Sequence, residues 1–372
     1  MKIRRIILKN VRNFVDFDYT FEDGWTGKIP EALLLIGPNG SGKTTLLEVI
    51  SGLWQILPAF LSTHYVRRVE LPSSNLMLYG TLVAIEIVGL REKSLWLFST
   101  HGGPGTLGDR EFIEETSQAY RIGYHYPYDH NDDRMVRILG WVEPGLGFRD
   151  YYENASNSDV PEYFPKWVQE WNQVLTENLF GKRKDLPNVV YLESEMRHLL
   201  SIDEKLSVQP EPDEFRWLAR YEPTTSRKGS LHNYLYNLKV VDETTFQQIV
   251  DETNEFLLGK SLNGFDRRTG DLMVKLENGH EHSINDLSSG EKQVLLMLAT
   301  ITRWLRPGGI VLIDEPDLHL HPTLTTAFVS HLRRMIKKKG GQLIIASHAT
   351  ELWQDFTESH RVELGRLGEM AA

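Results

Sequence analysis

An α/β fold with a mostly parallel sheet is predicted by three short apolar runs and a glycine-rich turn. The runs are Ala32–Ile36, Gly309–Ile313 and Gln342–Ala346, and none alternates polar with apolar residues, which is typical of strands buried on both faces. The turn follows the first run and precedes Thr45–Ile50, where apolar residues recur at helical spacing. Ligands of such sheets bind at the carboxyl ends of the strands, so the residues after each run are candidates for function.

The glycine-rich turn, Gly37–Thr44, is a full match to the phosphate-loop pattern G-x-x-x-x-G-K-[ST]. Glycines let backbone N–H groups surround phosphate oxygens, and the following helix adds the partial positive charge of its N-terminus. We expect Lys43 to reach the β- and γ-phosphates of ATP, and Thr44 to place its hydroxyl on Mg²⁺. The expected nucleotide contacts are Gly37, Asn39, Gly40, Ser41, Gly42, Lys43, Thr44 and Thr45.

Two carboxylates, Asp314 and Glu315, follow the second apolar run. Adjacent residues of a strand point to opposite sides, so we expect different roles for them. Asp314 would orient Mg²⁺ directly or through its waters, and Glu315 would polarise the attacking water as general base. The alternative, a solvated strand end, is opposed by the phosphate loop upstream, which requires an acidic partner of this kind.

Two further elements complete the pattern. The third apolar run is followed by His348, which taken alone would more often be a surface residue. Leu287–Gln293, upstream of the acidic strand, contains a Ser-x-Gly-Glu helix start, and the helix is expected to run from Glu291 through Trp304. The order of phosphate loop, helix start, acidic strand and histidine resembles that of ABC-class P-loop ATPases, in which the helix start is called the signature.

The resemblance implies ATP held between two copies of the chain. In ABC-class dimers the signature caps the partner's ATP, and the histidine, here His348, hydrogen-bonds the γ-phosphate. Ser288 would then supply a hydroxyl, Gly290 would allow close backbone approach, and the helix would direct its positive end at the phosphate. The implied contacts are Ser288, Ser289, Gly290 and Glu291. Symmetry makes a homodimer the simplest assembly, with a higher oligomer as the alternative.

The two ends of the chain indicate a branch of this class. Lys2–Phe14 resembles the opening strand and turn of chromosome-maintenance (SMC), RecF-like and OLD-like ATPases, which implies that Arg12 and Asn13 contact the nucleotide. Asp314–Pro322 resembles the same branch, and Asp317 would contact the partner subunit. Transporter subunits tend to carry a Gly-Gly-Gln signature instead.

One element of the class is missing from the sequence. ABC-class ATPases usually place a glutamine at the end of a strand between the two halves of the core, where it ligates Mg²⁺. Asn188–Leu192 is the expected strand, but Glu193–Arg197, which follows it, contains no glutamine. Gln118 is a weak alternative.

Three parts are expected along the chain. Residues 1–100 would hold the first half of the core, residues 101–265 an inserted, mainly helical or irregular lobe with one core strand near residues 189–193, and residues 266–372 the second half. The class adds an antiparallel β subdomain to the parallel sheet.

Local patterns supply the remaining elements. The runs Leu82–Val88 and Ser94–Ser99 predict one antiparallel hairpin, and Asn278-Gly279 predicts the turn of another between residues 271–276 and 280–284. Helical patterns occur near Pro165–Phe180 and Glu243–Leu258.

Composition excludes several classes of function. The 372 residues contain no cysteine, which excludes disulfides and thiol catalysis. No signal peptide or apolar run approaching a membrane span is visible, so a cytoplasmic protein without a membrane partner is expected. The net charge of −10 opposes broad attraction to nucleic acid. Basic residues gather at Arg333–Lys339, where DNA contact is one reading and a solvated helix face the other.

The expected function follows from what the chain lacks. There is no heptad run for a coiled-coil arm, and too few residues follow His348 for a nuclease domain of the OLD type. Short ABC ATPases of this build resemble the ATPase subunits of two-component prokaryotic defence systems such as Septu and PARIS, where the ATPase holds a separate nuclease or toxin. We therefore expect a sensor or scaffold for such an effector.

Three alternatives stay open. A RecF-like repair ATPase would grip DNA through its basic patches. A transporter subunit would associate with a membrane permease. A small-molecule kinase would not need the Ser288–Gly290 signature.

Overall fold

The computed structural model describes most of the chain: residues 1–61, 81–102, 110–127, 138–142, 149–151, 166, 168–171, 186–197, 217–221, 231–266 and 271–365. The chain forms two compact units. The first unit contains residues 1–30, 36–187 and 362–372, and the second contains residues 31–35 and 188–361.

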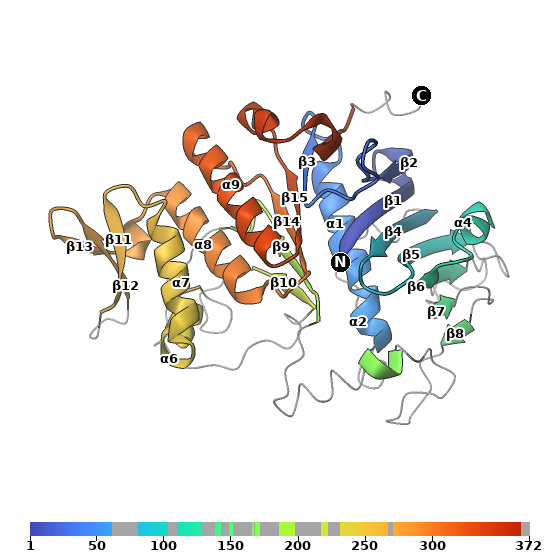
Figure 1. The fold of residues 1–372 in the computed structure, drawn as a ribbon, viewed down its shortest axis with the longest axis horizontal. Coiled ribbons are helices and arrows are strands. Elements are labelled where there is room, and N and C mark those ends of the chain that lie inside the picture. The colour runs from blue at the N-terminus through green and yellow to red at the C-terminus, as the bar shows by residue number, and fades with distance from the viewer. Residues whose placement is uncertain are drawn as a thin grey trace. The chain divides into compact units, whose positions relative to one another are not determined.

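The first unit is built on a seven-stranded sheet with the order β2-β1-β4-β5-β6-β7-β8 (Figure 1). In that order the strands are Phe14–Thr20, Lys2–Val11, Leu82–Val88, Leu95–Gly102, Tyr120–Pro127, Ile138–Val142 and Arg149–Tyr151. All neighbours pair antiparallel except β5 and β6, which are parallel and joined through α4 (Arg110–Glu115). Helix α1 (Lys43–Trp54) contacts β4 and β5, and α2 (Ile56–Leu61) contacts β6.

The second unit contains the parallel sheet that the apolar runs predict. Its strand order is β10-β9-β14-β15-β3-β16, and β3 and β16 each contain a point where the chain passes between the units. In that order the strands are Leu218–Arg220, Val189–Leu192, Ile310–Asp314, Gln342–Ala346, Ala32–Ile36 and Arg361–Glu363. Every residue of β9, β14, β15 and β3 is buried, which explains why their sequences show no alternation. These predicted strands are confirmed.

Helices and a small sheet complete the second unit. Helix α8 (Ser289–Trp304) contacts β9, and α9 (Pro322–Lys338) contacts β15. Helices α6 (Leu231–Val241) and α7 (Glu243–Asn254) contact each other, and α7 also contacts α8. The antiparallel strands β11 (Lys260–Phe265), β12 (Leu272–Leu276) and β13 (Glu281–Ser283) lie beside α7 (Figure 1). Short 3₁₀ helices occupy Ile284–Asp286, Thr350–Asp355 and Glu358–His360.

The interior of the chain differs from the mainly helical lobe expected over residues 101–265. The described part of this range contains α4, α6 and α7, but it also supplies β6, β7 and β8 to the first sheet and β9 and β10 to the second. The units divide after Pro187, inside the range. The aromatic residues of segments such as Tyr120–Pro127 favour strands, and this signal was missed.

The other local predictions have mixed outcomes. The two hairpins are confirmed as β4–β5 and β12–β13, and helix α7 is confirmed near its predicted place. Most of Pro165–Phe180 lies outside the described residues. No helix among the described residues is long and apolar enough to cross a membrane.

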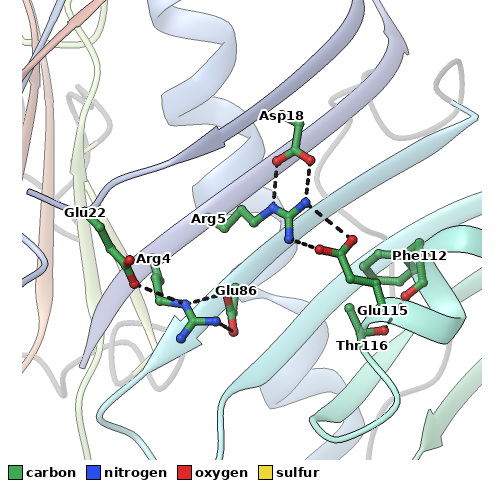
Figure 2. A network of polar contacts seen from close by, with 8 residues as sticks. All are labelled: Arg4, Arg5, Asp18, Glu22, Glu86, Phe112, Glu115 and Thr116. Atoms are coloured by element: carbon green, nitrogen blue, oxygen red, sulfur yellow. Dashed lines mark hydrogen bonds and ion pairs between the residues drawn. The ribbon is translucent and has the colours of Figure 1, made fainter. Parts of the chain in front are cut away.

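Two arginines of β1 tie the first sheet together (Figure 2). Arg4 makes two hydrogen bonds of 2.7 and 2.8 Å to the carboxylate of Glu86 on β4, whose side chain is only 1% exposed. Arg5 is paired with Asp18 of β2 and with Glu115 of α4, both of which are exposed. A buried carboxylate depends on its partner more than an exposed one does, because water cannot replace the lost bonds.

We therefore expect Arg4→Met to lower the free energy of unfolding by about 2 kcal/mol, because it leaves the buried Glu86 uncompensated. The control is Arg5→Met, whose exposed partners are rehydrated, with an expected loss of about 1 kcal/mol or less. Urea denaturation followed by tryptophan fluorescence measures both. Equal losses would show that burial of Glu86 does not set the difference.

Candidate functional site

The phosphate loop lies between β3 and α1, as predicted. Gly37, Gly40 and Gly42 all have positive φ, at 152°, 77° and 99°. A side chain at Gly42 would also overlap the ring of Phe14. The Ser41 hydroxyl is buried without a hydrogen-bond partner among the described residues, so a loop phosphate would satisfy it. The loop is therefore shaped to receive phosphate, and contact of its residues with a nucleotide stays a prediction.

Lys43 is positioned by the loop itself. Its ammonium group donates hydrogen bonds of 2.9 and 3.1 Å to the carbonyl oxygens of Gly37 and Pro38. The side chain is nearly buried, with 5% of the residue exposed. Its positive charge is thus held against the segment where the phosphates are expected.

The turn between β1 and β2 supports this loop. The Asn13 amide donates to the carbonyl oxygen of Gly40 at 3.0 Å, and Arg12 forms a 2.9 Å ion pair with Glu48 of α1. Arg12 also donates to the Thr45 hydroxyl at 3.2 Å and has a positive φ of 49°. Such a conformation costs about 1–3 kcal/mol in a non-glycine residue and persists only where neighbours hold it. Arg12 and Asn13 lie beside the loop, and their contact with nucleotide stays a prediction.

The acidic pair at the end of β14 has two different environments. Asp314 is 3% exposed and its Oδ2 accepts a 3.3 Å hydrogen bond from the Ser194 hydroxyl. The Glu315 side chain is one-third exposed, and its Oε1 lies 3.5 Å from Nε2 of His348, which follows β15. A partly exposed carboxylate next to an imidazole suits proton transfer to or from water, whereas the buried Asp314 suits binding a cation.

The structure thus brings together Asp314, Glu315 and His348 on the second unit. Thr44, the other predicted magnesium ligand, lies on the first unit.

Arg197 is a residue of this region that the sequence did not reveal. It is 3% exposed and donates to the main-chain carbonyl oxygens of Leu192, Asp314 and Glu315, the last at 2.6 Å. Its Nε donates to Gln293 of α8 at 3.2 Å. Burial lowers the pKa of Arg197 to about 10, against the opposing effect of nearby carboxylates, so the side chain remains a cation at neutral pH.

Ser194 and Arg197 belong to the segment where a glutamine is expected. No glutamine lies there, and the Ser194 hydroxyl contacts the carboxylate of Asp314, whereas Arg197 contacts its main-chain carbonyl oxygen. The sequence offers one signal for the role of Arg197: it is a charged residue shortly after an apolar, buried strand. A buried charged side chain at such a place needs hydrogen-bond acceptors nearby.

The signature forms a capped helix start. Ser288 is the N-cap of α8: its hydroxyl accepts from the Glu291 N–H at 3.3 Å, and Glu291 accepts from the Ser288 N–H at 2.9 Å. Lys260 of β11 forms a 2.9 Å ion pair with Glu291. Ser288 and Ser289 are exposed, so the positive end of α8 is accessible on this unit.

Gly290 has a role inside its own unit. A Cβ there would lie 2.6 Å from the carbonyl oxygen of His319 and 3.1 Å from Leu320. The expected reason for this glycine was close approach to the partner's ATP. The structure adds an internal reason, because the segment after Glu315 packs directly on the helix start.

That segment also uses its polar residues internally. Asp317 accepts a 2.5 Å hydrogen bond from the Ser347 hydroxyl, and His321 is the N-cap of α9. The expected contact of Asp317 with a partner subunit is not tested. Among the described residues, no group of three His, Cys, Asp or Glu side chains is placed to hold a metal ion by itself.

The charge of Glu291 has a consequence for stability. Partial burial raises the pKa of Glu291, but hydrogen bonds from Lys260 and Ser288 outweigh it and the pKa ends below its ordinary value. The carboxylate therefore stabilises the fold above its unfolded-state pKa, and this stabilisation is lost as the pH falls through the folded-state pKa. We expect Glu291→Gln to cost about 1 kcal/mol at neutral pH and progressively less in acid.

Thermal unfolding across this pH range measures the effect. In a Lys260→Met background the cost of Glu291→Gln should shrink at neutral pH. A cost that does not change with pH would show that the charge contributes nothing.

Similar proteins include a family of AAA domains and two probable ATPases. A family model described as "AAA domain, putative AbiEii toxin, Type IV TA system" matches residues 238–352, which include the signature helix, the acidic strand end and His348. The chain is 23% identical over 408 residues to "Retron Ec83 probable ATPase" of Escherichia coli, covering 95% of this chain and 69% of that protein. It is 22% identical over 391 residues to "Retron Vc95 probable ATPase" of Vibrio cholerae serotype O1 biovar El Tor, covering 94% and 70%.

Among solved structures, the SMC head domain from Thermotoga maritima matches with a TM-score of 0.38 and 11% identity, covering 95% of this chain and 92% of that one. The assignment of this chain rests instead on its own residues. The phosphate loop, the capped signature helix, the acidic end of β14 and His348 occur in the order of the class, and the family model covers the last three. The chain is therefore an ATPase whose motifs resemble those of the ABC class, with an AAA-type domain matched over residues 238–352.

Proposed function

We propose that two copies of this chain enclose ATP at composite sites, and that the closed dimer holds a separate effector, a nuclease or toxin, in antiphage defence in the prokaryotic cytoplasm. The observation that carries the dimer is the exposed, capped start of α8. The capping box uses the N–H groups of Ser288 and Glu291 and leaves the Ser288 hydroxyl proton to be donated to an anion from outside the unit. A phosphate bound by a second copy is the ligand that this helix start suits.

The residues divide the reaction between them. The phosphate loop binds the phosphates, with Lys43 donating to their oxygens in place of the loop carbonyls. Glu315 accepts a proton from water as the water oxygen bonds to the γ-phosphorus and the bond to the bridging oxygen breaks, giving ADP and phosphate. His348, beside Glu315, donates to the γ-phosphate. Thr44 and Asp314 would hold Mg²⁺, which would supply positive charge to neutralise the phosphates.

The defence role is supported by the names of similar proteins. The family description mentions a toxin and a type IV TA system, and two relatives are named for retrons. The chain spans about 70% of the length of each of these relatives. The proposed partner is therefore an effector protein.

Three of the five basic residues between Arg333 and Lys339 have partners inside the second unit, whereas Arg334 and Lys338 are exposed, so the DNA-binding alternative stays open. Arg333 donates to the Asp355 carbonyl oxygen at 2.7 Å, Lys337 is paired with Glu31, and Lys339 donates to the carbonyl oxygens of Thr302 and Leu305. These side chains have structural partners inside the second unit.

We expect Glu315→Gln to bind ATP without hydrolysing it, because the amide cannot accept the proton. Its mass in solution should change from monomer to dimer when Mg²⁺-ATP is added, measured by light scattering after gel filtration. The control is Glu315→Gln with Ser288→Arg, where the bulky cation blocks the helix start and the mass should stay that of a monomer. If nucleotide leaves the mass of Glu315→Gln unchanged, the ATP-gated dimer is refuted.

The effector is tested separately. Co-expression with the product of a neighbouring gene should give a complex that copurifies with this chain. Protection of cells by the ATPase alone, without a complex, would overturn the scaffold role.

A further inference from the structure

Arg197 joins three elements of the second unit through one side chain. It follows β9 and bonds back to the last residue of that strand, Leu192. Its two terminal nitrogens donate to the carbonyl oxygens of Asp314 and Glu315 at the end of β14. Its Nε donates to Gln293, three residues beyond Gly290 on the signature helix. The end of the catalytic strand and the signature helix are thus bonded to the same cation.

The conformation of Glu315 explains what this cation does. Glu315 has a positive φ of 48°, which non-glycine residues rarely adopt, so its backbone needs to be held in place. One hydrogen bond, from its N–H to the Ala346 carbonyl oxygen at 2.7 Å, fixes it to β15. Arg197 binds the carbonyl oxygen on the other side of the same residue, which also accepts a 3.1 Å hydrogen bond from the Leu318 N–H. The direction of the Glu315 side chain, and hence its distance from His348, follows from this backbone.

Only a guanidinium can make these bonds together. Its planar group presents several N–H donors in fixed directions, which suits two consecutive carbonyl oxygens and a third acceptor on α8. A lysine at this position would bring one charge but could not hold the same geometry. Burial of Arg197, which is 3% exposed, strengthens the constraint, since little water competes for its guanidinium.

We propose that Arg197 is a positioning residue that holds Glu315 in its catalytic orientation and transmits the position of the signature helix to it. The inference rests on the proposed role of Glu315 as the base and of the signature as the cap on a partner's ATP. When a phosphate draws the start of α8, Gln293 moves with the helix, and Arg197 carries the movement to the backbone of Glu315. Hydrolysis then depends on whether the signature is occupied.

The test compares Arg197→Lys and Gln293→Met with wild type. We expect kcat to fall about tenfold or more in Arg197→Lys while the Kd for ATP stays within about threefold, since the phosphate loop is untouched. Gln293→Met keeps Arg197 on the two carbonyl oxygens and removes only the bond to α8, so kcat should fall by a smaller factor with Kd unchanged. The matched control is Arg220→Lys on β10, whose guanidinium lies 2.8 Å from Glu193 instead.

A double-mutant cycle separates positioning from a general effect on the fold. Arg197→Lys should lower the residual single-turnover rate little further in Glu315→Gln protein, because the residue through which it acts is already disabled. ATP-dependent dimerisation of the double variant should persist. If Arg197→Lys lowers the melting temperature so far that the protein does not fold, Gln293→Met decides the question.

Two results would overturn the inference. One is a wild-type kcat in both Arg197→Lys and Gln293→Met, and the other is a fall of equal size in Arg220→Lys. Absence of ATP turnover or ATP-dependent dimerisation in the wild-type protein would be a different failure, because it refutes the proposed function itself.

Discussion

The parallel pairing of β14 with β9 on one side and β15 on the other is the constraint on which the catalytic residues depend. The registers place Ile313 opposite Leu192 and Asp314 opposite Ala346, so all three strands end at the same level. Residues that follow the strands therefore meet: Ser194 reaches Asp314, and His348 reaches Glu315. Backbone hydrogen bonds between buried strands fix these distances more firmly than any contact between the side chains could.

The start of the signature helix α8 has two structural requirements. It has to be exposed and well ordered to bind an anion, and the capping box with Lys260 provides this order. The same start has to fit against the segment after Glu315, where a Cβ on Gly290 would meet the carbonyl oxygen of His319. Gly290 is thus needed both for packing inside the unit and for the proposed approach of ATP. Loss of function on replacing Gly290 would therefore not by itself identify a contact with ATP.

The sequence predicted the elements whose information is local. The phosphate loop, the buried strands and the helix α8 are each encoded in a continuous segment, and each lies where it was expected. Ser194 and Arg197 escaped notice because their partners lie more than a hundred residues away along the chain, at Asp314 and Glu315. No local pattern specifies such a contact. Strands β6 to β8 lie where a mainly helical or irregular lobe was expected, although their aromatic residues favour strands.

The ion pair between Lys260 and Glu291 gives the three-stranded sheet β11–β13 a mechanical connection to the signature. Lys260 opens the first strand of that sheet, and Glu291 lies in the first turn of α8. At its other end α8 is held by Lys339, which binds the Thr302 and Leu305 carbonyl oxygens. A lysine side chain therefore contacts the helix at each of its ends. A protein that bound the three-stranded sheet could shift the signature serines through Lys260 and Glu291. It could then change access to ATP without touching the nucleotide.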